Sequence, residues 1–125
     1  MADKWLVVSV AGLGWSDIEK RNMKRMCGLG FEPASTVFPA VTCTVQASFR
    51  TASEPRDHGM TSNGVFNRDM SKAAFWEQSA ELVKGPRIWD AARTAGRAVA
   101  MMFWQQSLGE SADFIVSPAP IHKHG

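Results

Sequence analysis

The sequence has no tyrosine, only two cysteines and no apolar run long enough to cross a membrane. Its longest apolar run, residues 98–104, is far shorter than the roughly 20 residues that a spanning helix needs. The beginning of the chain also lacks the long apolar region and small-residue cleavage site of a signal peptide. These absences predict a cytoplasmic protein with no membrane partner, in which Cys27 and Cys43 stay free thiols.

The excess of one sign of charge over the other is also small. The chain has 14 Lys and Arg against 12 Asp and Glu, and its net charge is +2. Four basic residues gather between Lys20 and Arg25, but their spacing is typical of the solvated face of a helix. The charge distribution therefore predicts no nucleic-acid partner.

The length of 125 residues allows one domain with a modest core. Residues 5–10 are apolar and rich in valine, and they end at the glycine turn 11–14, which is typical of a buried parallel strand. A helix should follow, capped by Ser16 or Asp17, with Ile18, Met23 and Met26 on its apolar face and Gly28 and Gly30 at its end. A strand followed by a helix is the first half of a βαβ unit.

The rest of the chain alternates between helical and extended patterns. We expect a helix over 43–51, with Val45, Phe49 and Ala52 facing inward, and then a turn-rich segment over 53–59 and a turn at 63–64. A short extended piece at 65–66, helices over 73–83 and 88–94, and strands over 97–104 and 112–116 should follow. This order predicts an α/β fold with a mostly parallel sheet.

Thr42 stands where the N-cap of the helix over 43–51 is expected. Most threonines at this position serve only to cap the helix. The start of a helix also offers free backbone N–H groups and partial positive charge, and both suit a phosphate. A hydroxyl at this place could attack phosphorus if its pKa were lowered, so capping and nucleophilic roles are both open.

The residues around Thr42 follow the order of a known motif. A proline lies three residues before Thr42 and a serine six residues after it, and then come a threonine, a Pro-x-x-His-Gly turn and an asparagine. In this order the segment resembles the type I phosphodiesterase / nucleotide pyrophosphatase family of the alkaline phosphatase superfamily. The motif residues are Pro39, Thr42, Ser48, Thr51, Pro55, His58, Gly59 and Asn63, and similarity extends to 75–78, 88–89, 103–104 and 117–120. Asn63 lies one residue further from His58 than in the family.

The resemblance implies a hydrolase that cleaves phosphoester or pyrophosphate bonds of phosphate esters or nucleotides. Thr42 would be the metal-bound nucleophile, transiently phosphorylated or nucleotidylated. Asn63 and the backbone N–H of Cys43 would each donate a hydrogen bond to a phosphoryl oxygen. The family uses two zinc ions as cofactors. His58, before glycine in a tight turn, is better explained as a structural residue.

One position departs from the family pattern. Ala11 occupies the place of an aspartate that binds zinc at the end of the first strand, and a methyl group cannot bind a metal ion. His122 and His124 form a His-x-His pair, which at a chain end is usually an exposed tail. The other metal ligands of the family lie beyond the matched region, so we expect this chain alone to be inactive.

The expected architecture is a partial, truncated alkaline-phosphatase-like three-layer sandwich. Residues 1–125 would form its N-terminal, nucleophile-bearing part, and an uncovered sheet edge would favour self-association. An alternative is an α/β module that binds an anion or a partner without catalysis, using the helix start at Thr42 together with Asn63. A sulfatase is less favoured, because Thr42 cannot be oxidised to formylglycine.

Overall fold

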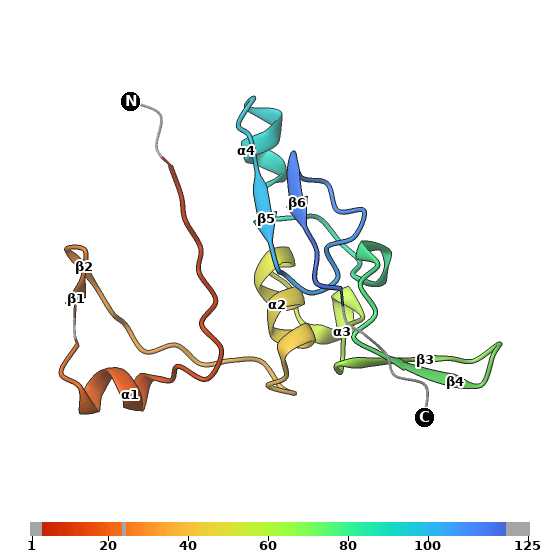
Figure 1. Ribbon diagram of the computed structural model, residues 1–125, viewed down its shortest axis with the longest axis horizontal. Helices are drawn as coiled ribbons and strands as arrows, with labels where there is room; N and C mark the ends of the chain where they lie inside the picture. The colour runs from red at the N-terminus through yellow and green to blue at the C-terminus, as the bar shows by residue number, and fades with distance from the viewer. Residues whose placement is uncertain (1–3, 24, 120–125) are drawn as a thin grey trace. The chain divides into compact units, whose positions relative to one another are not determined.

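A computed structural model describes residues 4–23 and 25–119 of the chain (Figure 1). The chain divides into two compact units, Met1–Ser35 and Thr36–Gly125, and each is described by itself. The secondary structure of the described residues is mixed α/β, with three two-stranded sheets among them, of which one is parallel. No helix within the described ranges has both the length and the apolar character to span a membrane.

The first unit contains one helix and one hairpin. Helix α1, Trp15–Lys20, begins after Gly14, whose N–H donates to the Asp17 carboxylate over 3.0 Å, and it buries Ile18. Strands β1, Arg25–Met26, and β2, Leu29–Gly30, pair antiparallel. Cys27 and Gly28 between them both have positive φ, +52° and +82°, which is the geometry that two-residue hairpin turns need.

Two expectations for the first unit are wrong. Residues 5–10 form no strand and are exposed, although the glycine turn after them is present, with Leu13 N–H donating to Val10 O. A strand needs a neighbour for its backbone groups, and among residues 4–23 and 25–35 the only strand pairing is the β1–β2 hairpin. The helix ends at Lys20 rather than near Gly28, so Met23 and Met26 are exposed instead of lying on its apolar face.

The second unit begins with two helices. Helix α2, Thr42–Thr51, has Val41 as its N-cap and ends at Ala52 in the left-handed conformation. Helix α3, Pro55–His58, lies within the segment expected to be rich in turns. The helix over 43–51 is thus confirmed, but its inward face is not the expected one. Phe49 is 47% exposed and Ala52 is also exposed, while the buried residues are Cys43, Thr44, Ala47, Arg50 and Thr51.

The next elements form an antiparallel hairpin. Strands β3, Gly64–Asn67, and β4, Lys72–Phe75, lie side by side in Figure 1, and Gly64 pairs with Phe75. This confirms the extended piece at Val65 and Phe66. The helix expected over 73–83 is wrong, since its first part is β4 and only the 3-10 turn η1, Ala80–Leu82, is helical. Pairing with β3 overrides the local helical tendency of this stretch.

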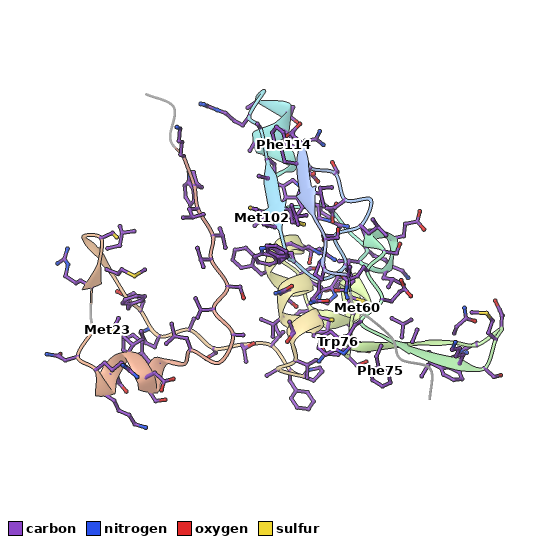
Figure 2. The ribbon with its side chains drawn as sticks, in the orientation of Figure 1. Met23, Met60, Phe75, Trp76, Met102 and Phe114 are labelled. Atoms are coloured by element: carbon purple, nitrogen blue, oxygen red, sulfur yellow. The ribbon has the colours of Figure 1, made fainter. Side chains whose placement is uncertain are left out.

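The last elements supply the parallel pair. Helix α4, Asp90–Thr94, precedes strand β5, Ala100–Met102, which pairs in parallel with β6, Phe114–Val116, in the register Met101 to Ile115. Both strands lie inside the ranges expected for them. The core of the unit contains Cys43, Ala47, Met60 and Val83. Figure 2 labels Met60 in this core and Met102 and Phe114 on the parallel pair, which are exposed.

Candidate functional site

Thr42 is the first helical residue of α2 rather than its N-cap. The N-cap is Val41, and no side chain caps the helix. The first helical hydrogen bond runs from Val45 N–H to Val41 O over 2.9 Å, so the N–H groups of residues 42–44 precede the helical ladder. Because the Thr42 side chain is exposed and takes no part in capping, its hydroxyl is available to a ligand.

Cys43 and Asn63 are brought together across 20 residues of sequence. The Cys43 N–H donates to the side-chain carbonyl Oδ1 of Asn63 over 3.0 Å. The expectation that each group donates a hydrogen bond to a phosphoryl oxygen stays a prediction, and the structure adds that the Cys43 N–H already has the Asn63 side chain as an acceptor. With Oδ1 engaged, the Nδ2 group of Asn63 keeps two donors for a ligand beside Thr42.

The Cys43 side chain is not a candidate nucleophile. The residue is fully buried, and burial raises the pKa of its thiol, against the smaller effects of the Gln106 hydrogen bond and the Arg50 charge. A thiol with a raised pKa stays protonated at neutral pH and is neither a good nucleophile nor a good metal ligand. Cys27 and Cys43 are both free, as expected from the sequence.

His58 is buried between α2 and the loop that follows α3. Its Nδ1 accepts the Met60 N–H over 3.1 Å, and its Nε2 lies 2.8 Å from the Ser48 hydroxyl. Burial is the main cause that lowers the pKa of this imidazole, and the positive charge of Arg50 lowers it further. The side chain thus connects two backbone segments, in agreement with the structural role expected for it.

A buried charge network supports the far end of α2. Arg50 is fully buried, and its Nη1 donates to the backbone oxygens of Gln105 and Gln106 at 3.1 and 2.7 Å. Glu110 lies 3.6 Å from Arg50 and accepts a 2.7 Å hydrogen bond from Arg87. Burial lowers the pKa of Arg50 to about 10, which leaves the guanidinium charged at neutral pH. The network fixes α2 against the segment 105–110.

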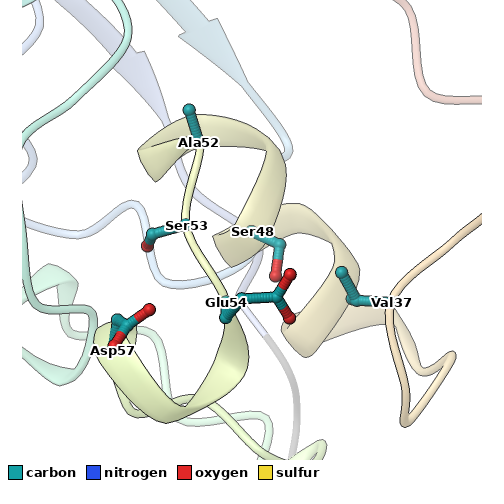
Figure 3. A pocket seen from close by; sticks show the side chains of 6 residues that line it. All are labelled: Val37, Ser48, Ala52, Ser53, Glu54 and Asp57. Atoms are coloured by element: carbon teal, nitrogen blue, oxygen red, sulfur yellow. The ribbon is translucent and has the colours of Figure 1, made fainter.

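A shallow cavity lies beside the second half of α2, as Figure 3 shows. Its volume is about 430 Å³, and its lining residues are Val37, Ser48, Ala52, Ser53, Glu54 and Asp57. Two carboxylates and no basic side chain face this cavity, so it does not suit an anion. Thr42 and Asn63 are not among its lining residues, and the cavity is therefore separate from the candidate site.

The residues present do not fit the zinc ions that the family resemblance implies. Among residues 4–23 and 25–119, no three His, Cys, Asp or Glu side chains come together as metal ligands. Thr42 offers one oxygen, and Ala11 offers none. His122 and His124 lie outside the described residues. The described residues around Thr42 therefore supply no set of metal ligands.

Comparison with known families agrees with the motif order around Thr42. A family model described as Type I phosphodiesterase / nucleotide pyrophosphatase matches residues 5–119 of the 125-residue chain. The chain belongs to this family, whose membership implies an alkaline-phosphatase-like fold, phosphoester substrates and a dependence on metal ions. No curated protein matches the chain.

Arg50 and Gln106 were not found by sequence reasoning. A signal for Arg50 exists, because Cys43, Ala47 and Arg50 follow the spacing that places residues on one face of a helix. No comparable sequence pattern predicts which residues pair with Arg50, since its partners Gln106 and Glu110 come more than fifty residues later in the chain.

Proposed function

We propose that this chain carries the phosphate-binding, nucleophile-bearing part of a phosphodiesterase or nucleotide pyrophosphatase site, with Thr42 as the nucleophile. The observation that supports this most is the exposed Thr42 hydroxyl on the first turn of α2, directly before the Cys43–Asn63 hydrogen bond. We further propose that residues 1–125 form part of a three-layer domain with a mostly parallel sheet, to which β5 and β6 contribute.

Recognition of a phosphate ester needs only groups of the second unit. The N–H groups of Thr42 and Thr44, which precede the helical ladder, and the partial positive charge of the helix start attract an anionic oxygen, while the Cys43 N–H is engaged by Asn63. The two Nδ2 donors of Asn63 add a side-chain contact on the same turn, because Oδ1 of that amide is held by the Cys43 N–H. The ligand class is therefore a phosphate ester or nucleotide, bound through its phosphoryl oxygens.

Hydrolysis requires more than recognition. In the family reaction the Thr42 oxygen would form a bond to phosphorus as the ester oxygen leaves, and water would then release the phosphoryl group. A threonine hydroxyl ionises far above neutral pH, so it needs a base or a metal to become reactive. Among the described residues no group of metal ligands forms, and both ring nitrogens of His58 are engaged, by Ser48 and by Met60. We propose that the chain by itself binds phosphate esters without hydrolysing them.

Binding and turnover can be tested separately on the full chain. Binding is measured as the rise in melting temperature on addition of inorganic phosphate, since a ligand that binds only the folded state stabilises it by an amount that grows with the logarithm of the ligand concentration once this exceeds the dissociation constant. Turnover is measured with a p-nitrophenyl phosphodiester and added zinc, for the unmodified chain and for Ala11→Asp, which restores a carboxylate in the turn after residues 5–10.

We expect phosphate to raise the melting temperature and the unmodified chain to show no turnover. Turnover that appears in Ala11→Asp and disappears when Thr42→Ala is added would support the nucleophile. Turnover that survives Thr42→Ala would contradict it, and a melting temperature unaffected by phosphate would contradict the binding site.

A further inference from the structure

Gln106 reaches the residue that follows the proposed nucleophile. Its Nε2 donates a 3.2 Å hydrogen bond to the Cys43 thiol sulfur, across 63 residues of sequence. Both residues are buried, with exposed fractions of 1% and 0%. Since burial keeps the thiol protonated, the sulfur accepts this hydrogen bond as a neutral group. The contact joins the first turn of α2 to the segment after β5.

Gln106 is itself held by hydrogen bonds to two segments, residues 77–78 and helix α2. Its backbone N–H donates to Gln78 Oε1 over 3.1 Å, and its backbone oxygen accepts from Arg50 Nη1 over 2.7 Å. The second Nε2 hydrogen goes to the backbone oxygen of Glu77 over 3.0 Å. The φ of Gln106 is +50°, a left-handed backbone conformation that residues other than glycine and asparagine rarely adopt. Such a conformation persists where surrounding contacts enforce it.

Cys43 is therefore fixed at two atoms by two distant residues. Asn63 holds its backbone N–H and Gln106 holds its sulfur. We propose that Gln106 is a positioning residue for the phosphate site: through the Cys43 sulfur it sets the first turn of α2, and hence the placement of Thr42 and the Asn63 amide. This inference rests on the proposed function for the site, but the geometric part of it can be measured without a ligand.

The test compares two glutamine substitutions in the full chain. Gln106→Met keeps the volume of the side chain and removes the donor to Cys43. Gln46→Met is the matched control, because Gln46 also connects α2 to the same segment, through a 2.8 Å hydrogen bond from Gln105 N–H to its Oε1 that does not involve the Cys43 thiol. The readouts are the dissociation constant for inorganic phosphate and the hydrogen exchange rate of the Cys43 amide in the free protein.

We expect Gln106→Met to weaken phosphate binding about fivefold or more and to speed exchange of the Cys43 amide about tenfold, as the Cys43–Asn63 hydrogen bond loosens. Gln46→Met should change either quantity less than about twofold, because its hydrogen bond to Gln105 involves neither the N–H nor the thiol of Cys43. If Gln106→Met folds poorly, Gln106→Gly serves instead, because glycine adopts the positive φ without strain while removing the same donor.

A double-mutant cycle with Cys43→Ala distinguishes positioning from general support of the core. If Gln106 acts through the sulfur, Gln106→Met should have little further effect on phosphate affinity once the sulfur is gone. Full additivity of the two effects would overturn the proposal. Cys43→Ser keeps an acceptor for the Gln106 amide and should retain most of the affinity.

The two readouts separate this proposal from the function on which it rests. If the unmodified chain does not bind phosphate while Gln106→Met still speeds exchange of the Cys43 amide selectively, the proposed function fails and the positioning geometry stands. If that amide exchanges at the same rate in both proteins, the positioning role is overturned whether or not phosphate binds.

Discussion

The Nε2 atom of His58 lies 2.8 Å from the Ser48 hydroxyl oxygen, while the Nδ1 atom of the same ring accepts the Met60 N–H. Because Nδ1 must be unprotonated to accept, the neutral ring carries its proton on Nε2 and donates it to Ser48. In this tautomer His58 cannot take a proton from Ser48. The pair therefore ties α2 to the loop after α3 and does not activate the serine.

Burial of His58 makes stability depend on pH. Since burial lowers the pKa of His58, below pH about 6.5 the unfolded chain binds a proton that the folded chain does not. The stability that depends on this difference in proton binding is fully present above that pH. The free energy of unfolding falls as the pH drops below it, by at most about 1.4 kcal/mol per pH unit. His58→Gln, which keeps a donor toward Ser48, should show a flatter slope.

The measurement is denaturant unfolding at several pH values between about 5 and 8, the range in which histidine titrates. Gln46→Met serves as a control that leaves His58 in place, and its slope should equal that of the unmodified chain. An identical slope in His58→Gln would show that His58 does not carry the pH dependence.

Thr42→Ala should leave stability nearly unchanged. The Thr42 hydroxyl is exposed and caps no helix, so its removal should alter the free energy of unfolding by less than about 0.5 kcal/mol. Chemical denaturation of the two proteins measures this difference. A loss of about 1 kcal/mol or more, the usual effect of removing an N-cap, would show that Thr42 caps α2 in solution.

Asn63 substitutions should separate stability from anion binding. Asn63→Asp keeps an acceptor for the buried Cys43 N–H but replaces the two Nδ2 donors with negative charge. It should therefore fold normally and show no rise in melting temperature with phosphate. Asn63→Ala leaves the Cys43 N–H without its acceptor and should lose about 1–3 kcal/mol. Phosphate binding by Asn63→Asp would exclude Asn63 as a donor to the ligand.

Gly64→Ala should destabilise the β3–β4 hairpin. A Cβ atom on Gly64 would lie 2.9 Å from the Cδ1 and Cε1 atoms of the Phe75 ring, closer than such atoms approach. We expect a loss of about 1–3 kcal/mol, typical of overpacking, measured by thermal unfolding. Gly30→Ala in β2 is the matched control, because nothing lies within 4 Å of its added Cβ. Restoration of stability by adding Phe75→Ala would identify the ring as the cause.

Elements with strong local signals were predictable. Helix α2 begins within one residue of the expected position, because a polar residue precedes a continuous helical pattern there. Strands β5 and β6 are short and apolar and fall inside their expected ranges. Strand β4 was missed because its alanines favour a helix locally, and its pairing with β3 depends on residues that lie outside that stretch.

The candidate site was predictable in its residues and less so in its hydrogen bonds. Motif order places Thr42, Cys43 and Asn63 together, but it does not reveal that the Cys43 N–H already donates to Asn63. The burial of Arg50 was not predicted, because charged residues are rarely buried. Its buried charge is offset by hydrogen bonds to the backbone oxygens of Gln105 and Gln106 and by the carboxylate of Glu110 at 3.6 Å, all from another part of the chain.

The segment from α2 to Asn63 is closed at two points, by the Cys43–Asn63 and Ser48–His58 hydrogen bonds. Closing a chain segment lowers its conformational entropy, and here the closure exists before any ligand arrives. An incoming phosphate would therefore immobilise little further backbone, so more of its contact energy would appear as affinity. Binding of this kind needs no prior rearrangement and should proceed in a single kinetic phase at a rate proportional to the phosphate concentration.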